Sequence, residues 1–323
     1  MVTLEHDVTI IGTGPAGLAA ALAADNSGAK TLLIEHEANL GGMLKQYMYN
    51  GFYLNREDNE HSWHEYTQKF INQLYNASIK IMVLTYITKL KKTENGFELI
   101  IVNKEGITKV FSKSIIFAYG SQKRNSFQTG IQSRYCAGIF TAGTIQDFIN
   151  NTEKVHIKNC VIIGANDVGL ITAYQLKYRG VQVHGVYEAK TVTTNSAKNI
   201  CQSFEDFNIP LYTGKTVTRI FGESRLNSVE ISSVDDNMVP ISGTEEKIDC
   251  DTLILAAELI QENILAESLG IPLDKDTGEP VIIQNQMTML EGIFICSSSL
   301  PIYENGEAAG RAAANWATQS KSA

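Results

Sequence analysis

The sequence has no apolar run long enough to cross a membrane and no N-terminal export signal. A membrane helix needs about 20 consecutive apolar residues, and no run in this chain approaches that length. Instead of a basic segment followed by an apolar core, the N-terminus enters a strand-like run, Val8–Ile11. These absences predict a soluble protein of the cytoplasm.

Cysteine is also scarce, and none of the five residues has a partner nearby in the sequence. They are Cys136, Cys160, Cys201, Cys250 and Cys296. No two have the spacing of a CxxC dithiol or of a zinc site. We therefore expect free thiols in a reducing compartment and no electron relay through a dithiol. His61 and His64 have a spacing that a metal could use, but the flanking acids are typical of a helix start, so no metal site is predicted.

Basic residues are in the minority. The chain has 27 Lys and Arg against 35 Asp and Glu, for a net charge of -8. The basic residues are scattered and form no stripe with interleaved aromatic residues. This pattern argues against a nucleic-acid partner.

What the sequence does contain is one supersecondary pattern, present twice. A strand, a glycine-rich turn, a helix and a second strand extend from Val8 to Glu35, and the same order returns from Cys160 to Glu188. Short β-rich runs follow each copy; in the first, turns are predicted at Glu94–Gly96 and Lys104–Gly106. A repeat this long predicts two related domains rather than a solenoid. A last strand near 292–296 and an alanine-rich helix from about Gly306 to Ala317 are also predicted.

The first turn has the pattern GxGxxG between a strand and a helix. Gly12 permits the sharp turn, Gly14 lets the backbone approach a diphosphate, and Gly17 lets the helix pack on the strand. The diphosphate would meet free N–H groups at the positive end of the helix. The loop residues concerned are Gly12, Thr13, Gly14, Pro15, Ala16 and Gly17. Glu35 ends the next strand, where a carboxylate can bind the ribose hydroxyls of an adenosine.

The second turn, Gly164–Gly169, departs from this pattern at its middle position. Glu188 again ends the following strand and favours NAD over NADP, because it would repel a 2′-phosphate. Asn166, however, replaces the middle glycine and crowds the space of the diphosphate, although asparagine tolerates left-handed backbone better than most residues. Two interpretations stay open: NADH binds weakly, or the domain keeps its fold without its ligand.

Several segments together resemble FAD-dependent pyridine-nucleotide oxidoreductases of the thioredoxin-reductase type. They are Gly12–Gly17, Glu35, Leu40–Leu44, Asn50–Phe52, Ala137–Thr144, Asp206–Pro210 and Glu262–Asn263. The last three are similar to a branch without the CxxC motif that is encoded beside glycerol-3-phosphate dehydrogenases. That branch includes FAD subunits of hydrogen cyanide synthase, opine oxidase and dye-linked proline dehydrogenase.

The resemblance implies an α/β fold with two Rossmann-like three-layer ββα domains, each with a β-meander insertion. Residues 1–121 and 261–323 would bind FAD, and 122–260 would form the NAD-type domain between them. Beyond the first loop, the implied FAD contacts are Glu35, His36, Gly42, Met43, Leu44, Ile87, Ala118, Tyr119, Gly120, Ser298, Glu307 and Ala308. The implied NAD contacts are Gly164, Asn166, Asp167, Val168, Gly169 and Glu188. The final helix, opened by Gly306–Ala309, would direct its dipole at the flavin.

Other departures from the family pattern fall near the expected flavin. Tyr119 replaces the Thr of Ala-Thr-Gly, Ser297–Ser298 replaces Gly-Asp, and Glu258 replaces a glycine. Tyr47 and Ser121 occupy positions that are cysteines in some relatives. Gln46 and Tyr47 are the only catalytic candidates, and neither is assigned a proton-transfer role.

Three hypotheses follow. The first is an FAD oxidoreductase reduced by NADH and reoxidised by a partner or small acceptor, since no dithiol is present. The second is an FAD-bearing electron-transfer or scaffold subunit of a dehydrogenase complex, with a degenerate nicotinamide site. The third is a catalytically silent dinucleotide-binding protein. A homodimer or hetero-oligomer is compatible with each.

Overall fold

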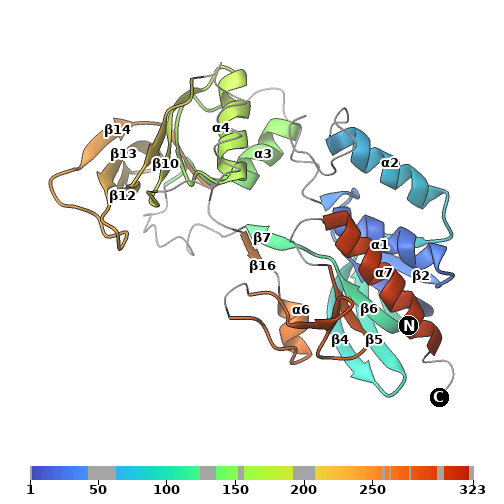
Figure 1. The fold of residues 1–323 in the computed structure, drawn as a ribbon. Coiled ribbons are helices and arrows are strands. Elements are labelled where there is room, and N and C mark those ends of the chain that lie inside the picture. The colour runs from blue at the N-terminus through green and yellow to red at the C-terminus, as the bar shows by residue number, and fades with distance from the viewer. Residues whose placement is uncertain are drawn as a thin grey trace. The chain divides into compact units, whose positions relative to one another are not determined.

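The computed structural model describes residues 2–42, 63–123, 136–151, 156–191, 208–256, 259–261, 263–275, 278–296 and 302–319. The chain divides into two compact units (Figure 1). Unit 1 comprises Met1–Gln122 and Gln261–Ala323, and unit 2 comprises Lys123–Ile260. Which ligand each unit binds stays a prediction.

Unit 1 is formed by the two ends of the chain and contains four helices among its described residues. Its helices are α1 (Pro15–Asn26), α2 (Trp63–Tyr75), α6 (Ile264–Ser268) and α7 (Ile302–Gln319). Its strands are β1 (Val2–Ile11), β2 (Thr31–Ile34), β3 (Lys80–Met82), β4 (Tyr86–Thr93), β5 (Gly96–Asn103), β6 (Gly106–Phe117), β17 (Ile282–Gln284), β18 (Met287–Thr288) and β19 (Ile293–Ile295). At the two chain crossings, β7 (Ser121–Lys123) pairs with β16 (Leu259–Gln261).

The sheet of unit 1 has the order β17-β18-β19-β6-β1-β2-β3. Strands β19, β6, β1, β2 and β3 are parallel, so their carboxyl ends lie at one edge. Strands β4, β5 and β6 form an antiparallel meander, and its turns lie at Glu94–Asn95 and Lys104–Glu105, as the sequence predicts. In open α/β sheets, ligands bind outside the carboxyl ends of the strands.

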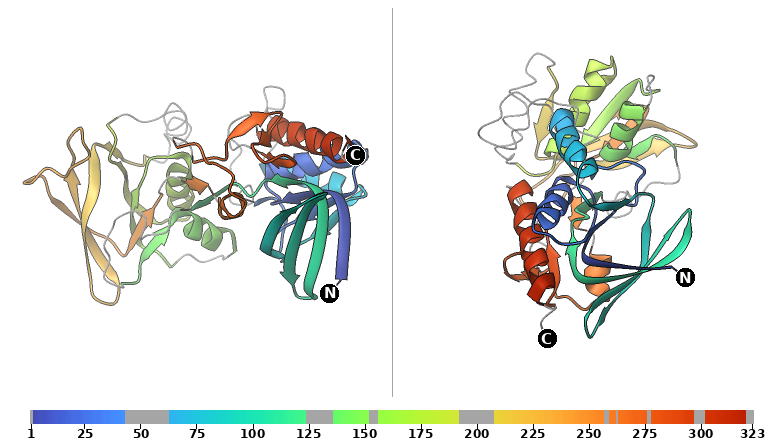
Figure 2. Two further views of the ribbon diagram at one scale, coloured as in Figure 1. Left: turned by 90° about the horizontal axis from the view of Figure 1, so that it is seen from below. Right: turned by 90° about the vertical axis from the view of Figure 1, so that its right-hand side faces the viewer.

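Each face of this sheet packs against its own layer, as alternating side chains of a strand require. Val8 and Ile10 of β1 face a core shared with α1 and α7. Ile11, on the opposite side of the same strand, faces a core shared with the meander, including Phe97 and Leu99. Helices α1 and α7 thus cover one face of the sheet, and the meander covers the other, together with Ala266 of α6 (Figure 2).

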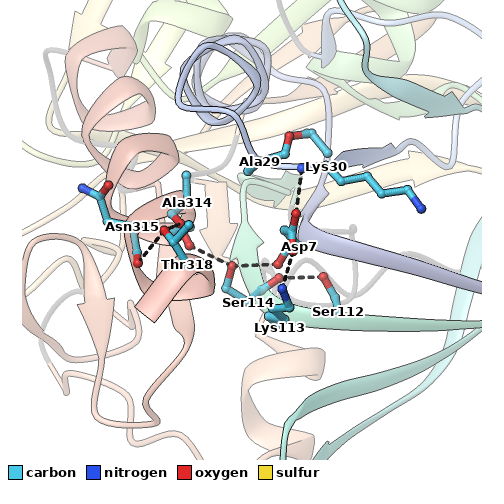
Figure 3. A network of polar contacts seen from close by, with 11 residues as sticks. Asp7, Ala29, Lys30, Ser112, Lys113, Ser114, Ala314, Asn315 and Thr318 are labelled. Atoms are coloured by element: carbon cyan, nitrogen blue, oxygen red, sulfur yellow. Dashed lines mark hydrogen bonds and ion pairs between the residues drawn. The ribbon is translucent and has the colours of Figure 1, made fainter. Parts of the chain in front are cut away.

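A polar network fastens α7 and the α1–β2 connection to the sheet (Figure 3). The Asp7 carboxylate accepts from the Lys30 backbone N–H at 3.0 Å and pairs with the Lys113 ammonium at 2.6 Å. The Ser114 hydroxyl lies 3.3 Å from the carbonyl of Asp7 and 3.2 Å from that of Ala313 on α7. Polar contacts therefore connect segments that lie far apart in the sequence.

Helices α1 and α7 cross at very short distance because small residues face each other. A Cβ on Gly306 would collide with the carbonyl oxygen of Ala16, and one on Gly310 with that of Ala20. Only glycine at these two positions allows the backbones to approach so closely. The crossing brings the C-terminal helix against the first turn of α1.

Unit 2 repeats the layered plan. Its strands are β8 (Ile139–Thr141), β9 (Asn159–Ile163), β10 (Gln182–Glu188), β11 (Leu211–Thr213), β12 (Lys215–Gly222), β13 (Leu226–Ser233), β14 (Glu246–Asp249) and β15 (Thr252–Leu255), and its helices are α3 (Ala142–Asn151) and α4 (Asp167–Tyr178). The parallel sheet has the order β11-β10-β9-β15-β8, and β12-β13-β14 form an antiparallel sheet. Val161 and Leu253 pack against Val217 and Val229 between the two sheets.

Among the described residues, no helix is long and apolar enough to cross a membrane.

Candidate functional site

The first glycine loop connects β1 to α1 at the carboxyl edge of the unit 1 sheet. Gly12 has φ +102°, and a Cβ there would collide with the Ala118 carbonyl. A Cβ on Gly17 would collide with the Gly12 carbonyl. These two glycines are therefore required by the fold itself.

Gly14 is different, because no contact with the described residues requires a glycine there. Its backbone is extended, with φ −61° and ψ 175°. No described heavy atom lies within 4 Å of the place where its Cβ would be. Gly14 is also the N-cap of α1, and no side chain caps that end in the described chain. The free space and the uncapped N–H groups together form a cradle for an anion.

Glu35 lies beside this cradle and is almost fully buried, with 4% of its side chain exposed. One carboxylate oxygen accepts from the Thr13 backbone N–H at 3.0 Å and also from the Thr13 hydroxyl. The other accepts from the Glu37 N–H at 2.9 Å and lies 3.1 Å from His36 Nδ1. Burial alone raises the pKa of Glu35, but the hydrogen bonds from His36 and Thr13 outweigh it and lower the pKa to about 2. The carboxylate is therefore ionised at neutral pH.

An exposed patch lies next to Glu35 and consists of His36, Val83, Leu84 and Tyr86. The His36 side chain is 65% exposed, and its ring centroid lies 6.3 Å from that of Tyr86. Val83, Leu84 and Tyr86 are exposed, and the Leu84 N–H donates to the Glu37 carbonyl at 3.1 Å. An exposed aromatic ring beside an ionised carboxylate is suited to stacking against a flat heterocycle. Sequence reasoning missed Tyr86 and Leu84; the unusual exposure of apolar residues at the start of β4 reveals them only in the structure.

Three further segments converge on the cradle. The Gly41 N–H donates to the Thr13 carbonyl at 3.0 Å, and a Cβ on Gly42 would lie 3.0 Å from Gly14 Cα. Ala118 follows β6 and donates its N–H to the Ile11 carbonyl at 2.8 Å. The Cys296 thiol, after β19, lies 3.9 Å from the Ala16 carbonyl, and burial raises its pKa to about 12. Cys296 is therefore a neutral packing group.

The predicted start of the last helix is wrong. We expected Gly306–Ala309 to open it, but α7 begins at Ile302, about one turn earlier, with Glu304 in its first turn. A carboxylate there stabilises the positive end of the helix, which favours the earlier start. Glu307 and Ala308 thus lie inside the helix, and Glu307 pairs with Arg311 at 3.2 Å. Gly306 still touches Ala16 at the start of α1.

The second loop in unit 2 copies this backbone closely. Gly164 has φ +102°, as Gly12 does, and a Cβ there would collide with the Ala256 carbonyl. A Cβ on Gly169 would collide with the Gly164 carbonyl. Glu188 accepts from the Ala165 N–H at 3.0 Å and from the Lys190 N–H at 3.0 Å. The frame of a dinucleotide loop is therefore intact.

Asn166, in contrast, fills the cradle of this loop. It has φ −82° and ψ 171°, so the left-handed backbone that we considered is not used. Its Oδ1 accepts from the Gly169 N–H at 3.0 Å, which caps α4, and its Nδ2 donates to the Ala256 carbonyl at 2.7 Å. The amide thus consumes hydrogen-bonding capacity that the first loop leaves free.

Comparison with known proteins places this geometry in a family. The family model described as pyridine nucleotide-disulphide oxidoreductase matches residues 6–313. The chain belongs to that family. It is 22% identical to a thioredoxin reductase of Mycoplasma genitalium over 90% of this chain and 86% of the relative. It is 24% identical to ferredoxin–NADP reductase 2 of Bacillus cytotoxicus over 90% of this chain and 83% of that protein.

A solved structure agrees with the predicted fold class. The thioredoxin reductase of T. acidophilum superposes with a TM-score of 0.76 at 21% identity, covering 98% of this chain and 99% of that one. Two Rossmann-like units are thus confirmed for this pyridine nucleotide-disulphide oxidoreductase.

Several predicted site residues of this family member lie outside the described residues. They are Met43, Leu44, Gln46, Tyr47, Glu258, Ser297 and Ser298. His61 is also outside, and nothing is described of the His64 side chain; the described part of the chain has no group of three metal-ligating side chains. Of the remaining predicted positions, Tyr119 lies beside Phe117, with the ring centroids 5.2 Å apart and the rings tilted by 40°. Gly120 has φ +67°, and Ile87 packs on the meander core, so its contact with FAD stays a prediction.

Proposed function

We propose that the chain binds FAD in unit 1 and is an oxidoreductase whose flavin is reduced by NADH. A partner protein or a small acceptor, rather than a dithiol of the chain, then takes the electrons. Both named relatives are reductases, which supports redox chemistry in this chain.

The observation that carries the FAD assignment is the free space at Gly14. Packing requires glycine at positions 12 and 17, but no contact with the described residues requires it at position 14. A diphosphate that approaches the protein backbone closely explains why residue 14 has no side chain. The diphosphate would accept from the N–H groups of Ala16 and Gly17, since Pro15 has none. When bound, FAD supplies hydride and one-electron chemistry, and the protein holds and orients it.

The adenosine end of FAD would lie toward Glu35 and the exposed patch beside it. Both oxygens of this carboxylate already have two polar neighbours, which is about the capacity of a carboxylate. The His36 side chain is 65% exposed, whereas Thr13 is buried and Glu37 donates from its backbone, so a ribose hydroxyl would replace His36 with little disturbance. His36 and Tyr86 are then placed to flank the adenine.

Two observations support the identity of the electron donor and the route of reoxidation. Glu188 occupies the position where a carboxylate accepts from a free 2′-hydroxyl and repels a 2′-phosphate, which favours NADH. No two cysteines of the sequence form a CxxC motif. The missing CxxC motif agrees with the branch that the sequence resembles, which includes FAD subunits of hydrogen cyanide synthase, opine oxidase and dye-linked proline dehydrogenase.

One purified preparation tests the proposal. We expect a yellow protein that releases FAD on denaturation, with a flavin absorbance at about 450 nm. Anaerobic titration should bleach this band with NADH at lower concentration than with NADPH, with dithionite as the control for full reduction. A colourless protein would contradict FAD binding and favour the silent protein; bleaching by dithionite alone would contradict only the NADH part.

A second function, an electron-transfer subunit without nicotinamide binding, is favoured by Asn166. Its side chain caps α4 and bonds to Ala256, in the space where the diphosphate of NADH would lie. A dehydrogenase partner would then reduce the flavin. Co-purification of a second polypeptide, with reduction of the flavin only in the complex and by the partner's substrate, would decide for this function.

A further inference from the structure

The chain carries two copies of one loop that differ at their ligand-facing position. In unit 1 the N-cap of α1 is Gly14, which makes no side-chain cap in the described chain. In unit 2 the N-cap of α4 is Asn166, whose amide makes two hydrogen bonds of 2.7 and 3.0 Å. The outer glycines and the terminal acid match in the two units, whereas Asn166 stands at the position of Gly14.

The two hydrogen bonds of Asn166 have separate consequences. The bond from the Gly169 N–H satisfies one of the donors that a helix start offers to an anion. The bond to the Ala256 carbonyl ties the loop to the residue after β15, which is 90 positions away in the sequence. Crowding by the Cβ is a separate effect, because a Cβ would enter the space that the matching Gly14 leaves open in the described residues.

We propose that Asn166 is an internal competitor of the nicotinamide nucleotide and sets its affinity. The diphosphate binds only after the Asn166 amide releases Gly169 and Ala256. This inference rests on the proposed function, because it concerns the same site, but it is a statement about binding rather than about electron transfer.

The size of the effect follows from what the nucleotide must displace. An N-cap and one further hydrogen bond together correspond to about a 10- to 100-fold change in an equilibrium constant. Removing the amide should tighten NADH binding by about that factor. The same change should lower the melting temperature of the protein without nucleotide, because α4 loses its cap.

The test compares Asn166→Ala and Asn166→Gly with the native protein. Asn166→Ala removes both hydrogen bonds but keeps the Cβ, so it separates capping from crowding. Asn237→Gly, at an exposed position of unit 2, is the matched control. The dissociation constant of NADH is measured by calorimetry on FAD-loaded protein, and the melting temperature is measured with and without NADH.

We expect both Asn166 variants to bind NADH at least about tenfold more tightly than the native protein. Both should melt lower without nucleotide, and the control should change neither value. Equal affinity in all proteins, a gain by the glycine variant alone, or no binding in any variant would overturn the proposal. Tight binding without bleaching of the flavin would support it and contradict NADH reduction, so the two failures are distinguishable.

Discussion

At the scale of single residues, the glycines of the first loop separate fold from ligand. Gly14→Ala places a methyl group in open space, so the free energy of unfolding in urea should be nearly unchanged for the protein without FAD. The amount of FAD that stays bound through purification should fall. Gly17→Ala forces a methyl group into the Gly12 carbonyl and should destabilise the fold by about 1–3 kcal/mol or more. Flavin content and urea unfolding of both variants check this. Equal loss of stability in both would show that Gly14 is structural.

His6 gives a second prediction at this scale, through the pH dependence of stability. Burial, and then the nearby charges of Lys30 and Lys80, lower the pKa of His6 to about 4. The unfolded chain binds this proton near pH 6.5, so the folded state loses stability as the pH falls from 6.5 to 4. The loss between pH 7 and pH 5 should be about 2 kcal/mol.

Two variants isolate the contribution of His6. His6→Leu should flatten the decline in the free energy of unfolding between pH 7 and pH 5, and His156→Leu, at an exposed position, should leave it unchanged. Glu35 does not interfere, because its lowered pKa of about 2 makes its contribution fall only between about pH 4.5 and pH 2. An unchanged slope in His6→Leu would contradict the assignment.

At the scale of elements, the crossing of α1 and α7 depends on Gly310. In an ordinary helix interior, Gly→Ala stabilises by up to about 1 kcal/mol. Gly310→Ala should do the reverse and cost about 1–3 kcal/mol, because its Cβ collides with the Ala20 carbonyl. Asn315→Ala, at an exposed position of the same helix, should not destabilise. Urea unfolding measures both, and a more stable Gly310→Ala protein would refute the close crossing.

The same element shows what local sequence can and cannot predict. The two strand–loop–helix units and the meander turns were predictable, because glycine spacing and apolar periodicity are local signals. The start of α7 was not, since Gly306 resembles a helix breaker and its reason is contact with Ala16, far away in the sequence. The bond from Asn166 to Ala256 was hidden for the same reason, because Ala256 follows a strand that lies 90 positions away in the sequence.

At the scale of the whole molecule, the division into units predicts that unit 2 can be removed. Strands β7 and β16 are neighbours in one sheet, and each has three residues, so the two ends left in unit 1 lie within about 10 Å of each other. A flexible linker of about ten residues in place of 124–258 spans that distance easily.

The shortened protein keeps both cores of unit 1 and the whole Gly12–Gly17 loop, so it should fold and bind FAD with one flavin per chain. Dithionite should bleach it, and NADH should not. If it folds by circular dichroism but is colourless at saturating FAD, the first loop alone does not hold the flavin, and residues of unit 2 must complete that site.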